Sequence, residues 1–241
     1  MAAVTAATRR AGARTVTQAS PPPLLSPPGL SKPRLRGVSH QWAFFVSLLT
    51  GLALVVSAPT GRATVAAAIY AGSVAGLFGA SALYHRITWA SAAARRWMRR
   101  LDHSMIFILI AGTYTPFALL SLDGAIATAI LIAVWAGALA GIVMKLLWID
   151  APKWLVALTY VLLGWVAVAA FPQLLKEIGV TATALVAAGG LLYTAGAVVY
   201  TRRRPDPAPT VFGYHEVFHA LVIAAAALQF AVVAFYVVPG A

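Results

Sequence analysis

The sequence predicts an all-α fold: a polytopic membrane protein, a seven-transmembrane-helix bundle with the N-terminus cytoplasmic and the C-terminus outside. Three observations indicate this fold. The 241 residues are 61% hydrophobic and only 10% charged, whereas soluble globular domains usually carry about a quarter charged residues. Seven apolar segments follow one another with short connections. The Lys and Arg residues that flank these segments fall almost entirely on one side of the predicted membrane.

The N-terminal region, residues 1–38, differs from the rest of the chain. It is rich in Ala, Ser, Thr, Arg and Pro, includes PPPLLSPP, and contains no acidic residue. Such a segment cannot bury enough apolar surface to offset its ordering entropy, so we expect a disordered Arg/Pro-rich cytoplasmic tail. The composition also resembles that of an organellar transit peptide, although a GC-rich coding bias gives the same pattern. A plain tail is the favoured interpretation, and residues 39–241 then form the transmembrane domain.

Each apolar segment is close to the roughly 17 to 25 residues that a bilayer-spanning helix requires. The predicted spans are approximately 42–58, 63–85, 101–121, 124–144, 153–172, 180–200 and 214–238. Because the connections are short, a single seven-helix bundle is the simplest arrangement.

The orientation follows from the distribution of positive charge. Of the 18 Lys and Arg residues, sixteen lie in the tail and in the connections after the second, fourth and sixth segments. Only Arg62 and Lys176 lie on the other side. The positive-inside rule therefore places the N-terminus in the cytoplasm and, after seven crossings, the C-terminus outside.

Composition also excludes several functions. The chain has no cysteine, so disulfides, thiolate zinc sites and cysteine nucleophiles are excluded. The net charge of +12 does not predict nucleic-acid binding, because the basic residues flank apolar segments instead of forming a patch on a polar domain. We expect membrane lipids as partners and a location in the cytoplasmic membrane. The sequence contains no indication of the oligomeric state.

Polar residues cluster at three places in the apolar segments. Ser81 and His85 end the second, Asp102 begins the third, and His215 and His219 begin the seventh. Ionisable groups in membrane helices cost roughly 2.5 kcal/mol or more on insertion scales, so each needs a partner or a function. By the predicted topology, all three clusters lie at one depth near the cytoplasmic face. The topology is predicted from Lys and Arg alone, so the shared depth of the three polar clusters is not built into it.

Three imidazoles from two helices predict a site for Zn²⁺. We expect His85, His215 and His219 as metal ligands, which leaves a fourth position for water, as in catalytic zinc sites. A bound zinc lowers the pKa of a water toward about 7. Asp102 is the candidate residue to orient or deprotonate the water, and Ser81 the candidate to stabilise a developing oxyanion or hold the water by a hydrogen bond.

Several assignments near this site stay open at the level of sequence. His103 competes with His85 as third ligand; adjacent helical residues point about 100° apart, and we favour Asp102, not His103, facing the bundle. Glu216 is either a base or the partner of an arginine in the preceding loop. His40 is interpreted as a polar residue at headgroup level.

The His-Glu-x-x-His pattern at 215–219 also occurs in zinc metalloproteases. An intramembrane metalloprotease needs a third ligand, commonly the Asp of a Leu-Asp-Gly turn, and this chain contains one with Asp123. The predicted topology places Asp123 on the outer side, roughly 30 Å from His215. The protease interpretation is therefore the least favoured.

Together, SALYH at 81–85, RRLDHSMIFILIAGTYTPF at 99–117, GW at 164–165 and HEVFHALVIAAAALQF at 215–230 resemble the hemolysin III proteins. These TrhA-type proteins are the bacterial branch of the progestin and adiponectin receptor superfamily. The resemblance covers about residues 36–238. It implies a seven-helix bundle with a cytoplasmic N-terminus and a buried zinc near the cytoplasmic face. The family's Ser-x-x-x-His element matches Ser81 and His85, and its His-x-x-x-His pair matches His215 and His219. The family's aspartate, which contacts zinc through a water, matches Asp102.

The wider superfamily includes ceramidases, which suggests metal-dependent hydrolysis of a lipid amide or ester. The leading hypothesis is therefore a zinc-binding membrane protein with such an activity and a role in membrane homeostasis. The alternative is a non-enzymatic sensor of membrane state, or a pore-forming cytolysin, with a structural zinc.

Overall fold

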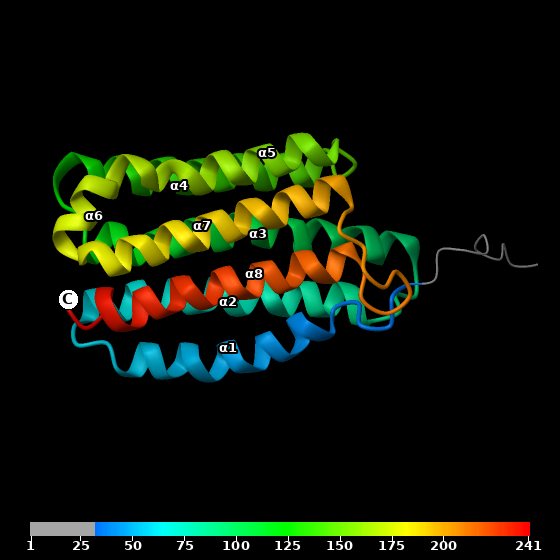
Figure 1. The fold of residues 1–241 in the computed structure, drawn as a ribbon, viewed down its shortest axis with the longest axis horizontal. Helices are drawn as coiled ribbons and strands as arrows, with labels where there is room; N and C mark the ends of the chain where they lie inside the picture. Colours follow the sequence, from blue (N-terminus) through cyan, green and yellow to red (C-terminus); the bar gives the residue numbers. More distant parts are fainter. Residues whose placement is uncertain (1–31) are drawn as a thin grey trace, which may run out of the picture. The chain divides into compact units, whose positions relative to one another are not determined.

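The computed structural model describes residues 32–241 and consists there of helices joined by short connections (Figure 1). Seven helical stretches in this range are long and apolar enough to cross a membrane, which confirms the predicted all-α class with seven spans; the orientation of the termini stays a prediction. In chain order the elements are α1 (Val38–Val56), α2 (Gly61–Arg86), α3 (Ala92–Leu120), α4 (Gly124–Leu147), α5 (Lys153–Gly164), the 3₁₀ turn η1 (Trp165–Ala170), α6 (Phe171–Glu177), α7 (Gly179–Arg202), α8 (Tyr214–Val232) and the π-helical end η2 (Val233–Val237).

Helix boundaries differ most from the prediction in α3, which begins at Ala92 and not near residue 101. The side chain of Ser91 accepts a hydrogen bond from the backbone N–H of Ala94 at 3.1 Å and caps the helix. Hydropathy identifies the part of a helix that is suited to the bilayer and does not identify the end of the helix. The basic residues before residue 101 therefore fall outside the predicted span although they are helical. Arg95, Arg96, Arg99 and Arg100 therefore lie on the first turns of α3.

The spans form a closed ring. Helix α1 packs against α2, α2 against α3, and α3 against α4; α5 contacts both α4 and α7, α7 packs against α8, and α8 returns to α1. Figure 1 shows the connections α2–α3, α4–α5 and α7–α8 at one end of this bundle, with the C-terminus at the other. The predicted polar clusters of α2, α3 and α8 are thus brought to one end of the bundle.

Large apolar side chains cover the outside of the ring. Leu49, Leu147 and Phe235 are 73%, 82% and 72% exposed, a pattern that is costly in water over so large a surface but suited to lipid. The buried side of the helices carries the polar groups described below.

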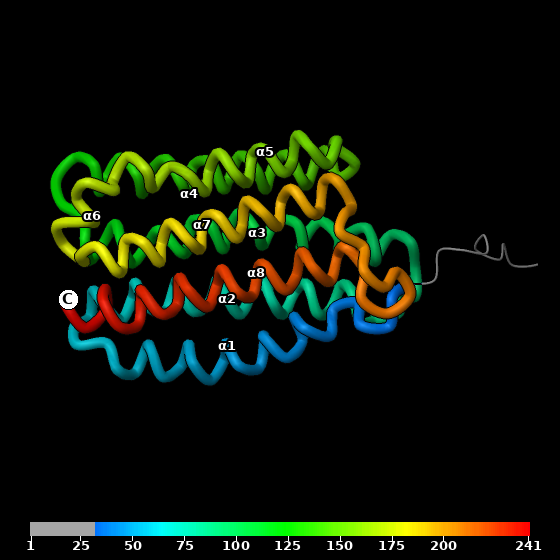
Figure 2. Tube along the Cα trace, viewed as in Figure 1, coloured from blue at the N-terminus to red at the C-terminus, as the bar shows by residue number. Residues whose placement is uncertain are grey.

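Residues 32–37 form an ordered segment that precedes α1. Backbone N–H groups of Arg34 and Leu35 donate to the carbonyl oxygens of Thr210 and Val211 at 3.0 and 3.1 Å. Figure 2 shows this segment beside the connection between α7 and α8. Residues 32–37 of the predicted disordered tail are therefore ordered, because their backbone groups find hydrogen-bond partners in a loop distant in sequence. The part of the predicted tail before residue 32 lies outside the described residues.

Gly37 ends this segment and meets two requirements that only glycine meets together. Its φ is +78°, in the left-handed region, and a Cβ at this position would lie 2.6 Å from the Cβ of His85. The backbone entering α1 therefore lies directly against His85.

Candidate metal centre

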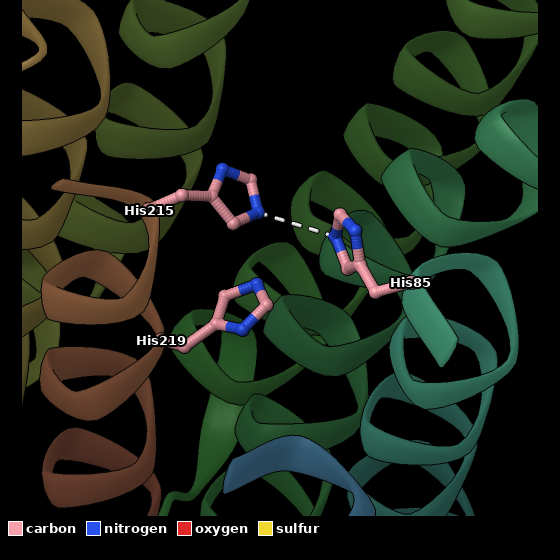
Figure 3. Close-up of side chains that lie close together, drawn as sticks. All are labelled: His85, His215 and His219. Atoms are coloured by element: carbon pink, nitrogen blue, oxygen red, sulfur yellow. Dashed lines mark hydrogen bonds between the residues drawn. The ribbon is translucent and has the colours of Figure 1, made fainter. Parts of the chain in front are cut away.

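Three histidines from α2 and α8 lie together at one end of the bundle. Each offers one nitrogen, and the three nitrogens lie within 4.8 Å of one another. Figure 3 shows the imidazole rings of His215 and His219, one helical turn apart on α8, facing His85 on α2. The Nε2 atoms of His215 and His85 are 3.1 Å apart. These are the three residues that the sequence predicts as metal ligands.

The donor set suits a zinc ion. Two imidazole nitrogens at about 2.0 to 2.1 Å from a tetrahedral zinc would be roughly 3.3 Å apart, close to the separation of the Nε2 atoms of His85 and His215. His85 and His219 are 8% and 2% exposed, and Nδ1 of His219 is buried without a hydrogen-bond partner among the described residues. A cluster of buried imidazoles is costly without a ligand that uses its lone pairs. The site can therefore hold a metal ion.

Two further predicted site residues lie beside the histidines. Asp102 Oδ2 on α3 is 4.0 Å from His85 Nε2, and Ser81 lies one turn before His85 on α2 and is 3% exposed. Both line the same internal cavity as His215 and His219. The structure brings together all five residues that the sequence analysis selected.

His40 is a site residue that the sequence analysis missed. It is 3% exposed, its ring stacks on that of His219 with centroids 3.7 Å apart, and its Nδ1 is 2.8 Å from Ser81 Oγ. His40 thus links a predicted ligand to the predicted catalytic hydroxyl. His40 precedes the first predicted span, 42–58, by two residues, which gives it the same predicted depth as the other clusters, but a single polar residue at a helix end is typical of headgroup contact.

His103 does not join the histidine cluster. The cluster contains His85 and not His103, whose Nδ1 is buried without a partner among residues 32–241. Both Asp102 and His103 nevertheless line the cavity. The expectation that only Asp102 faces the bundle is therefore too restrictive.

Glu216 is engaged in structural contacts. Its Oε2 accepts a hydrogen bond from the backbone N–H of Gly213 at 2.9 Å, which caps the start of α8. Its Oε1, which is buried, forms an ion pair with Nε of the partly exposed Arg36. The partner is an arginine, as one of the two open alternatives stated, but it comes from the segment before α1 and not from the α7–α8 loop. With both oxygens occupied, Glu216 does not have the free carboxylate that a protease base requires.

Asp123 is also excluded from this centre. It precedes α4 at the end of the bundle opposite Asp102, and the α3 residues between them extend over roughly 28 Å at 1.5 Å per residue. The histidine cluster contains no contribution from it.

Replacing Arg36 with methionine is expected to destabilise the protein by about 3 kcal/mol, because it leaves the carboxylate of Glu216, 1% exposed, without its cation. Thermal unfolding in neutral detergent measures the effect. Arg34→Met is the matched control, since Arg34 is exposed. The double variant Arg36→Met/Glu216→Gln should recover part of the loss, and equal melting temperatures for the parent and Arg36→Met would contradict the assignment.

The site opens into a long apolar cavity of about 210 Å³. Its walls include His219 and Asp102 at one end and Phe117 and Leu122 toward the other. Asp102 and Phe117 are fifteen residues apart on α3, or roughly 22 Å along the axis. The cavity is therefore long compared with the histidine cluster at its polar end.

Comparison with known proteins identifies the family of this chain. The chain matches the family described as haemolysin-III related over residues 29–230. It is 31% identical over 207 residues to hemolysin-3 of Bacillus cereus, covering 85% of this chain and 91% of that protein. It is 32% identical over 170 residues to a hemolysin-3 homolog of Bacillus subtilis (strain 168), covering 70% and 76%. With seven apolar helices and this extent of similarity, the chain belongs to the haemolysin III family.

Proposed function

We propose that this haemolysin III protein binds zinc in the cytoplasmic membrane and hydrolyses an amide or ester bond of a membrane lipid, with a role in membrane homeostasis. The observation that carries the proposal is the position of two buried histidines, a partly buried one, a carboxylate and a hydroxyl at the polar end of a long apolar cavity. A hydrolytic centre at one end of such a cavity suits a substrate with one reactive bond and one extended chain.

The apolar part of the cavity favours an acyl chain. Leu109, Phe117 and Val186 are among the side chains that line it, and its length of roughly 22 Å between Asp102 and Phe117 suits an extended alkyl chain better than a compact ligand. A chain in this position would bring its carbonyl group to the level of Ser81 and Asp102 while the rest of the channel excludes water.

The protein residues then have separate roles. We assign zinc binding to His85, His215 and His219; zinc, when bound, supplies a Lewis acid and makes water more acidic. Asp102, whose Oδ2 is 4.0 Å from His85 Nε2, orients the attacking water and accepts its proton. Ser81 donates a hydrogen bond to the carbonyl oxygen as negative charge develops. His40, 2.8 Å from the Ser81 hydroxyl, fixes its direction.

The test is release of free fatty acid from amphiphiles with labelled acyl chains, one N-acyl and one O-acyl, by purified protein in neutral detergent. We expect release that stops on addition of a chelator and returns with zinc. Release that persists in the chelator would contradict a zinc hydrolase. Zinc-loaded protein that releases nothing from either class would favour the non-enzymatic alternatives.

The name hemolysin, which both relatives carry, favours one of those alternatives, a cytolysin with a structural zinc. This alternative predicts leakage of dye from liposomes exposed to the protein without release of fatty acid. If the protein is a receptor-like sensor with a structural zinc, we expect neither dye leakage nor release of fatty acid. The same preparation therefore separates the three functions.

A further inference from the structure

A second group of polar residues lines the cavity away from the histidines. Arg99 on the first turns of α3, Lys145 near the end of α4 and Lys153 at the start of α5 all contribute to its wall. None of them is used in the proposed hydrolytic centre. Three cations on the wall of a largely apolar cavity require an explanation.

Lys145 is the most unusual of the three because its side chain is buried. The residue is 2% exposed, and its Nζ donates to the carbonyl oxygen of Ile149 at 3.2 Å. Among residues 32–241 no carboxylate forms an ion pair with it. A lysine ammonium has three donors, so this buried cation retains donors without a protein acceptor.

Arg99 approaches the same point. Its Nη2 donates to the same Ile149 carbonyl oxygen at 3.1 Å and to Oδ1 of Asp150 at 2.8 Å. Since both cationic nitrogens lie within 3.2 Å of one oxygen, they are at most about 6.4 Å apart. The side chain of Asp150 is 74% exposed and is absent from the cavity wall, so it offsets the charge of Arg99 from outside.

Lys153 and His103 complete the arrangement. Nζ of Lys153 lies 4.6 Å from the ring centroid of Tyr200 and 5.7 Å from that of Tyr214, which holds it at the wall. The ring of His103 is also on the wall, and its buried Nδ1 has no hydrogen-bond partner in the described part of the chain. Within residues 32–241, Asp102 is the only carboxylate that lines the cavity, and it lies beside His85.

We propose that Lys145, Arg99 and Lys153 bind the anionic group, phosphate or carboxylate, of an amphiphile whose chain occupies the apolar part of the same cavity. The proposal deepens the proposed function and rests on it for the position of the chain. Charge-assisted hydrogen bonds from two cations to one oxyanion are among the strong polar contacts in proteins. A purely structural role for Lys145, as a cap for the end of α4, requires only its hydrogen bond to the carbonyl oxygen of Ile149. That role does not explain why Arg99 and Lys153 lie on the same wall of the cavity.

The experiment measures binding of three labelled amphiphiles with the same chain: palmitate, hexadecyl phosphate and hexadecanol. Purified protein in neutral detergent with a chelator is compared with Lys145→Met, Lys145→Arg and the control Arg96→Gln, which removes an exposed arginine of α3 that does not line the cavity. We expect Lys145→Met to weaken binding of both anions by about ten- to a hundredfold and to leave hexadecanol unchanged. Lys145→Arg should retain most of the preference for anions.

Several results would overturn the proposal. One is equal binding of all three amphiphiles by the parent protein; another is an equal loss in Arg96→Gln, which would indicate only surface charge. Displacement of hexadecyl phosphate by an equal concentration of inorganic phosphate would refute the need for a chain. If Lys145→Met does not fold, Lys153→Met at the helix start provides the same comparison.

The result is independent of catalysis, because binding is measured in the chelator without turnover. A protein that prefers anions but releases no fatty acid would leave this site intact and contradict only the hydrolase. A protein that hydrolyses lipids but binds hexadecanol as well as palmitate would contradict only the anion site.

Discussion

Replacing His219 with alanine is expected to lower the zinc content of the purified protein from about one ion per chain to nearly none, since three protein ligands are the usual minimum for a stable zinc site. His219 is 2% exposed, so no other side chain or bulk water readily replaces its nitrogen. Metal analysis of protein purified in detergent without added chelator measures the loss.

His103→Gln is the matched control for this variant. His103 is another histidine at the same end of the bundle, but it lies outside the cluster of His85, His215 and His219. We expect this variant to retain zinc. Equal zinc contents in the parent and His219→Ala would refute the assignment of the metal site, whatever the activity of the protein.

The second large effect concerns Ser81 and Asp102. Ser81→Ala and Asp102→Ala are each expected to keep zinc and the fold while reducing fatty-acid release by roughly 10² to 10³-fold, the range typical of a lost general base or oxyanion donor. Neither residue belongs to the histidine cluster, so metal content and thermal unfolding of the variants should stay close to those of the parent.

Ser81→Thr provides the conservative comparison, because it keeps a hydroxyl beside His40 Nδ1. It should retain more activity than Ser81→Ala. If the histidine variants alone abolish the biological effect and the Ser81 and Asp102 variants are fully active, the zinc is structural and the hydrolase proposal is wrong.

Much of the fold and of the cluster follows from one-dimensional patterns. Apolar length predicts the spans, and ionisable residues in such spans are rare enough that His85, His215 and Asp102 stand out. Their depth follows from counting Lys and Arg. The structure places them together because helices that cross in alternate directions bring the end of α2 and the starts of α3 and α8 to one end of the bundle.

Other features depend on contacts that no periodicity encodes. His40 is identified only by its stacking on His219, and Arg36 only by its pairing with Glu216. Both come from a part of the chain where composition predicts a tail or a headgroup contact. Lys145 likewise resembles a topology signal in sequence, because being near a helix end does not distinguish a lysine that extends into lipid headgroups from one that turns inward.

The contacts of Glu216 have a consequence for the rotational register of α8. If α8 moved by one residue in its register against the neighbouring helices, His215 and His219 would turn by about 100° around the helix axis and away from His85. The bond from Gly213 and the ion pair with Arg36 fix that register. We therefore expect the segment before α1 to influence the affinity of the proposed metal site through a rotation of α8, although no residue of that segment belongs to the histidine cluster.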